Sequence, residues 1–129
     1  MKRLLLIFIL IVSSCSEQKS IIDISDKWEG IGYQINIRET WKIEVTKKSK
    51  NVYFINYPDI PCSGEWTVVS ESQNKITLKE DIKNDTNNCI VESEVIITKI
   101  NDKNLSVTFF LSNDKAKLYS FGVLEKSSL

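Results

Sequence analysis

Residues 41–57 read WKIEVTKKSKNVYFINY, and this stretch decides the fold. In its first half, Trp41, Ile43 and Val45 alternate with charged or hydroxyl side chains, a period of two residues that is typical of a half-buried β-strand. Polar residues 48–50 follow, and then a second, mostly apolar strand begins. Because so short a connection favours antiparallel neighbours, the stretch predicts two adjacent antiparallel strands.

The same alternation extends outward from this pair. From Trp28 onward, apolar positions recur with a period of two, and polar turn clusters return about every ten residues. Helical periodicity is not sustained in this part of the sequence. We therefore expect eight strands, at residues 28–37, 41–47, 51–57, 63–70, 75–82, 89–100, 105–111 and 117–126.

Eight short strands with short polar connections predict an all-β fold. The favoured architecture is a closed, antiparallel, up-and-down barrel, since closure removes exposed strand edges. The alternative is a sandwich of two β-sheets.

The N-terminus is typical of an export signal. Lys2 and Arg3 precede an unbroken apolar run at residues 4–12, which is followed by two serines and Cys15. The run is too short to cross a bilayer, which takes roughly 20 residues. A signal peptide is therefore expected rather than a permanent membrane helix.

The ending VSSC at residues 12–15 resembles the lipobox of bacterial lipoproteins. This resemblance implies a signal peptide at residues 1–14 and acylation of Cys15 as the first mature residue, with anchoring to a membrane of the cell envelope on its periplasmic or surface face. Several acyl chains anchor stably where one is marginal. The alternative is an ordinary signal peptide. Residues 15–26 then form the lipidated cysteine and a tether, and residues 27–129 form the β-barrel domain.

Two cysteines remain in the exported part, Cys62 and Cys89. An even number in an oxidising compartment predicts a disulfide bond. The bond would close a loop of about 28 residues and stabilise the fold by roughly 3.6 kcal/mol in the chain-entropy description. Because neighbouring strands alternate in direction, both cysteines should lie at one end of the barrel, away from the tether. Two buried free thiols are the alternative.

The segment YPDIPCSGEW at residues 57–66 is the most distinctive part of the sequence. Pro58 and Pro61 fix a loop beside the predicted disulfide. The structural interpretation is a rigid corner with a core tryptophan. The functional interpretation is a recognition loop, which makes Tyr57, Pro58, Pro61 and Trp66 candidate ligand residues.

Glu80 is the one acidic residue in phase with an apolar face. It shares the phase of Ile76, Leu78 and Ile82, so its carboxyl group should point into the core. A buried carboxylate needs partners or a raised pKa. We expect either a structural carboxylate bonded to loop amides or an acidic group at the mouth of a ligand cavity.

Several of these motifs together resemble a known family. Trp28-x-Gly30, the Tyr-Pro-x-x-x-Cys-Ser-Gly run from Tyr57, and Leu78-x-Glu80 followed by a second cysteine are similar to small disulfide-bonded extracytoplasmic β-domains. These domains occur in bacterial lipoproteins and as external modules of membrane-anchored serine/threonine kinases. The Trp-x-Gly start also resembles lipocalin-like barrels, although their motif has the glycine first. The resemblance implies a binding module without assigned catalytic residues.

Composition restricts the function classes. The chain has no histidine, the commonest general base and metal ligand, and no recognisable nucleophile motif. Lysine and arginine number 17, equal to the acidic residues, so no basic footprint for nucleic acid exists. We expect no enzyme, metal or cofactor, but a membrane-anchored binding module for a small apolar or peptide-like ligand. The alternative is an envelope protein-interaction lipoprotein similar to a lysozyme inhibitor.

Overall fold

The structure is a computed structural model, and it describes residues 22–84, 89 and 92–127. The expected signal peptide and Cys15 lie outside these residues. The strands in chain order are β1 (Trp28–Gln34), β2 (Glu39–Ser49), β3 (Val52–Tyr57), β4 (Cys62–Ser72), β5 (Lys75–Asn84), β6 (Glu92–Lys99), β7 (Asn104–Leu111) and β8 (Asp114–Lys126). The described residues include no helix that is long and apolar enough to span a bilayer.

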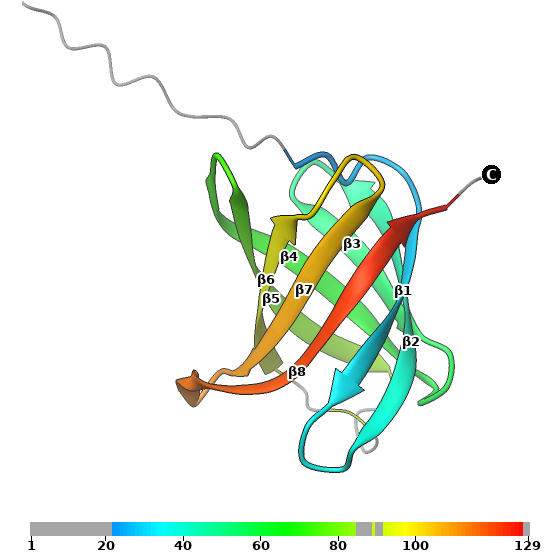
Figure 1. The fold of residues 1–129 in the computed structure, drawn as a ribbon, viewed down its shortest axis with the longest axis vertical. Coiled ribbons are helices and arrows are strands. Elements are labelled where there is room, and N and C mark those ends of the chain that lie inside the picture. Colours follow the sequence, from blue (N-terminus) through cyan, green and yellow to red (C-terminus); the bar gives the residue numbers. More distant parts are fainter. Residues whose placement is uncertain (1–21, 85–88, 90–91, 128–129) are drawn as a thin grey trace, which may run out of the picture.

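The eight strands form one closed antiparallel barrel (Figure 1). Each strand pairs with its neighbours in sequence, and β1 closes the barrel by pairing with β8, from Trp28 opposite Lys126 to Gln34 opposite Ser120. The predicted up-and-down barrel is confirmed, and the sandwich is excluded because a single sheet runs around the whole molecule.

Alternating side chains fill the barrel interior. Trp41, Ile43 and Val45 on β2 all point inward and are buried, as their spacing predicts. Other strands contribute aliphatic and aromatic side chains at the same period of two. The largest fully buried side chains include Trp66, Phe109, Ile43, Ile55, Ile76, Leu78, Ile97, Leu105 and Leu124.

Strand boundaries differ from the sequence prediction by up to three residues, and two of these differences change the interpretation. β1 ends at Gln34 rather than at residue 37, because the chain turns there and Arg38 adopts a positive φ of 56°. Ile35 and Ile37, which were expected at the end of this strand, lie exposed in the turn. β6 begins at Glu92, so Cys89 precedes the strand instead of opening it.

Residues 22–26 belong to the folded domain rather than to a free tether. Ile22 and Ile24 are 7% and 2% exposed and join the hydrophobic core. Figure 1 shows this segment lying across the end of the barrel where β1 begins and β8 ends. The sequence prediction assigned these isoleucines to the tether, but their side chains are buried against this end of the barrel.

Gly64 on β4 marks a close approach between two strands. A Cβ at this position would lie 2.2 Å from the carbonyl oxygen of Asp81 and 2.7 Å from the Cα of Ile82. Because both are backbone atoms, β4 and β5 would have to separate. We expect Gly64→Ala to lower the free energy of unfolding by about 2 kcal/mol, measured by urea denaturation.

The matched control for this prediction is Thr67→Ser, on the same strand but exposed on the outer wall. This change should alter the free energy of unfolding by less than about 0.5 kcal/mol. Wild-type stability in Gly64→Ala would show that the two strands are not held this closely.

Candidate functional site

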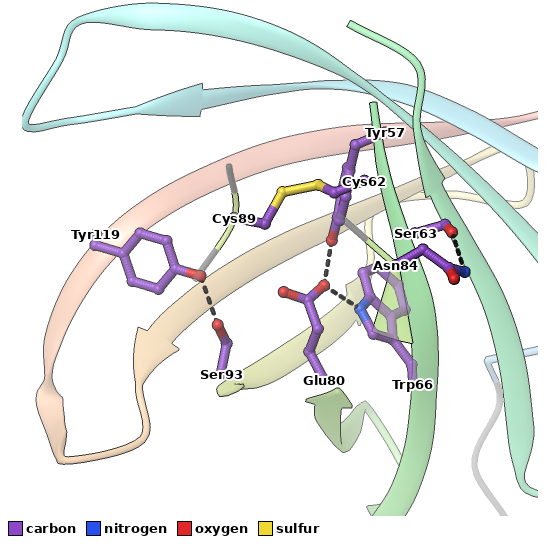
Figure 2. The surroundings of a disulfide bond; sticks show 9 residues. All are labelled: Tyr57, Cys62, Ser63, Trp66, Glu80, Asn84, Cys89, Ser93 and Tyr119. Atoms are coloured by element: carbon purple, nitrogen blue, oxygen red, sulfur yellow. Dashed lines mark hydrogen bonds between the residues drawn. A yellow bond between two sulfur atoms is a disulfide. The ribbon is translucent and has the colours of Figure 1, made fainter. Parts of the chain in front are cut away.

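Glu80 lies inside the barrel near the disulfide end. Its position on β5 faces inward, and the residue is 3% exposed, which confirms the direction that its phase predicts. The side-chain hydroxyl of Tyr57 and the indole Nε1 of Trp66 both donate hydrogen bonds to its Oε2, the latter at 2.7 Å (Figure 2). The partners are side chains from β3 and β4 rather than the loop amides expected from the sequence.

A second polar pair lies on the other side of Glu80. The hydroxyl groups of Ser93 on β6 and Tyr119 on β8 are 2.6 Å apart (Figure 2). Ser93 is 1% exposed, and a hydrogen bond from it to Glu80 lowers the pKa of the Glu80 carboxyl group. Three neutral donors from three strands therefore surround one carboxylate.

Burial nevertheless dominates the ionisation of this carboxyl group. Desolvation raises the pKa of Glu80 from 4.5 to about 7, against the lowering effect of its hydrogen bonds. Burial, and then the charge of Glu80, also raise the pKa of Tyr57 and of Tyr119 well above the ordinary value for tyrosine. Near neutral pH, Glu80 is thus the group that changes charge at this site.

The disulfide spans the barrel end beside Glu80. Cys62 opens β4 and is bonded to Cys89, and the two Cα atoms are 6.5 Å apart (Figure 2). Cys62 belongs to the core, and Cys89 packs against it. The predicted disulfide is therefore present, and it fixes the chain beyond β5 against the start of β4.

Aromatic rings surround the same region. Phe109 lies at the centre of the cluster, with ring centroids 5.5 Å from Trp41, 5.9 Å from Trp66 and 6.2 Å from Tyr119. Trp41 also meets Tyr57 edge to face at 5.1 Å. Such contacts hold the rings of Trp41, Tyr57 and Tyr119, which line the site, in place.

A cavity of about 80 Å³ opens at this end of the barrel. Its lining combines aromatic rings, one carboxylate, one amide and the disulfide, and consists of Gln34, Trp41, Tyr57, Ile60, Glu80, Cys89 and Tyr119. Larger hollows of about 500 and 420 Å³ lie on the outer wall around β1, and one of about 190 Å³ lies beside Ile22 at the opposite end; none of them includes Glu80. The small cavity is distinguished from these hollows by a buried carboxyl group in its lining.

The structure separates the sequence-predicted ligand residues into three groups. Tyr57 and Glu80 line the cavity together. Trp66 is fully buried and holds Glu80 through its hydrogen bond without being part of the lining. Pro58 and Pro61 are exposed in the adjoining loop and do not line the cavity, whereas Ile60 between them does.

Other residues in and around the cavity were not predicted from the sequence. Trp41 and Tyr119 read as ordinary core aromatics, and Gln34 gave no distinctive signal. Ser93 carried a usable signal, because it is a polar residue in phase with the buried Val95 and Ile97. The Nε1 atoms of Trp41 and of Trp28, which lies toward the opposite end, are buried without a hydrogen-bond partner among the described residues.

No protein-family model matches this chain, and no curated protein matches it in sequence. Two solved structures of redesigned β barrels share its fold. The first has 11% sequence identity and a TM-score of 0.60, covering 81% of this chain and 91% of its own. The second, mFAP1 bound to DFHBI, has 12% identity and a TM-score of 0.60, covering 79% and 94%. At such identities the similarity shows the fold alone, a β barrel.

Proposed function

We propose that this chain is a lipid-anchored, non-catalytic binding module of the bacterial cell envelope, which recognises a small or peptide-like ligand at the disulfide end of its barrel. The observation that carries the proposal is the cavity lined by Glu80 at that end. Ile22 and Ile24 pack over the opposite end, and the hollow of about 190 Å³ there does not include Glu80, so a ligand of the Glu80 cavity approaches from the disulfide side. The likeness to mFAP1, a barrel bound to the small molecule DFHBI, supports binding as a use of this architecture.

The size of the cavity restricts what enters it. Large side chains such as Trp66 and Phe109 fill the middle of the barrel, and the cavity measures about 80 Å³. A typical small-molecule pocket holds roughly 300–1,000 Å³. This cavity therefore takes one protruding group of a ligand, and a peptide-like ligand fits better than an enclosed apolar one.

A protein partner is the second candidate, because a filled barrel with a rigid loop at its rim presents a surface rather than a deep pocket. The loop between β3 and β4 is fixed by two hydrogen bonds, from the Ile60 amide to the Tyr57 carbonyl oxygen at 3.1 Å and from the Lys42 amide to Asp59 Oδ2 at 3.1 Å. An envelope inhibitor would use this loop as its contact surface.

Capture from envelope extract tests both candidates. The immobilised mature protein should retain a small ligand or a protein, and Ile60→Asp at the cavity rim should abolish that retention. Val69→Asp, on the outer wall where Val69 is 66% exposed, is the matched control and should retain the same material. Equal capture by the two variants would place binding elsewhere and reject the proposed site.

Lipidation of Cys15 gives a separate prediction. Expressed in bacteria, the full chain should incorporate labelled palmitate and fractionate with membranes, and Cys15→Ala should do neither, because the acyl chains are its anchor. A variant with Cys62 and Cys89 both changed to alanine is the control and should still be labelled. Normal membrane fractionation of Cys15→Ala would contradict the anchoring.

A further inference from the structure

We infer that the cavity at the disulfide end binds a primary ammonium group, such as the tip of a lysine side chain, with Glu80 as its counter-ion and aromatic rings as its walls. This inference rests on the proposed function and names the chemistry of its ligand. It is carried by the charge of Glu80, the aromatic lining and the volume of the cavity.

The charge at the site is uncompensated. Glu80 is buried, and its hydrogen bonds come from neutral donors: Tyr57, Trp66 and Ser93. Among the residues that the structure describes, no lysine or arginine forms a salt bridge with it, whereas six lysines pair with acidic side chains elsewhere. A buried charge is costly without an opposite charge. The described residues supply no such charge to Glu80, so a bound cation would provide it.

Glu80 retains acceptor capacity toward the cavity. A carboxylate offers about four acceptor sites, and the three donors fill three of them. The bonds from Tyr57 and Trp66 both end on Oε2, while Figure 2 shows Oε1 directed toward Ser93 and Tyr119. Gln34 adds a second acceptor, because its Nε2 is engaged with Asn36 Oδ1 at 2.8 Å and its carbonyl oxygen remains for a ligand N–H.

The walls favour a cation over a neutral group. Trp41, Tyr57 and Tyr119 line the cavity, and the faces of such rings attract an ammonium group within about 6 Å. Ile60 and the disulfide at Cys89 complete the lining with apolar surface that suits methylene groups. A slender chain ending in an ammonium group matches this order of surfaces from rim to floor.

The volume sets the size of the group. A cavity of about 80 Å³ holds two to three water volumes of about 30 Å³ each. An ammonium group with one or two methylenes fills this space.

The test uses the mature protein and n-butylammonium chloride as probe, followed by NMR titration and calorimetry. Wild type should bind with a Kd on the order of 1 mM, and n-butanol, equal in length but uncharged, should bind at least tenfold more weakly. Glu80→Gln should weaken binding of the amine at least tenfold. Asp81→Asn, which removes a charge from the outer face at the adjacent position, should bind as wild type does.

A pH series on the wild type needs no variant to fold. The other titratable groups that line the cavity, Tyr57 and Tyr119, stay neutral because burial raises their pKa values, and the amine stays protonated. Ionisation of Glu80 should therefore strengthen binding by up to about tenfold between pH 6 and pH 8, given a pKa of about 7.

The possible failures are distinguishable. Equal binding of butanol and butylammonium, unchanged binding in Glu80→Gln, or affinity that is flat with pH would each reject the ammonium site while leaving the proposed binding function in place. Capture that survives Ile60→Asp would reject the proposed function itself.

Discussion

Replacing Cys62 and Cys89 with alanine is expected to lower the free energy of unfolding by about 3.6 kcal/mol. The disulfide closes a loop with a sequence separation of 27, and cutting it restores the freedom of this loop to the unfolded chain. For a domain of about 100 residues, each 1 kcal/mol shifts the melting temperature by roughly 4–8 °C. The melting temperature should therefore fall by roughly 15–30 °C, measured by circular dichroism.

Reduction of the wild type separates loop entropy from packing. Cys62 is 1% exposed, so its change to alanine also removes a buried sulfur from the core. Dithiothreitol breaks the bond without creating that void. In the wild type it should therefore lower the free energy of unfolding by most of the amount that the double alanine change does. It should leave the double variant unchanged. A loss below about 1 kcal/mol on reduction would mean that the bond does not constrain the unfolded chain as the loop length implies.

The architecture was predictable because its determinants are local. Alternation at Trp41, Ile43 and Val45 specifies which face of β2 is inward, and short polar turns specify antiparallel neighbours. Closure then follows from the cost of two exposed edges. The phase of β1 is harder to read, because glycines 30 and 32 face inward there while Ile31 is 60% exposed. The ring of Trp41 fills the space over Gly32, so the inward face of β1 is set by its neighbour.

The site was predictable only in part because its contacts run between strands. The phase of Glu80 on β5 predicts a buried carboxyl group, and this prediction needed only the sequence. Its donors, Tyr57, Trp66 and Ser93, come from three other strands, and which of them meet depends on the register of each pair. In that register Trp66 lies opposite Glu80, and Glu80 lies opposite Ser93. Such pairings follow from turns and bulges, including the shift between Ser63 and Gly64, that alternation does not specify.

The titration of Glu80 should make the domain less stable as pH rises from 4.5 to 7. Burial raises the pKa of this carboxyl group from 4.5 to about 7, so within that window the folded chain holds a proton that the unfolded chain has lost. The free energy of unfolding therefore falls with rising pH, by about 3 kcal/mol in total, and levels off above pH 7. Urea denaturation at intervals of pH measures the slope.

Glu80→Gln isolates this effect, because glutamine is neutral throughout and its carbonyl oxygen still accepts from Tyr57 and Trp66. The variant and the wild type should be about equally stable near pH 4.5, where both side chains are uncharged. Their free energies of unfolding should diverge as pH rises, and the variant should be more stable than the wild type by about 3 kcal/mol at pH 8. Groups such as Asp102, whose pKa Lys99 holds below its ordinary value, titrate alike in both proteins and cancel in the difference. A difference that does not change with pH would mean that Glu80 is ionised throughout the window. The buried charge would then be balanced by the fold itself, and the reason for an incoming cation would disappear.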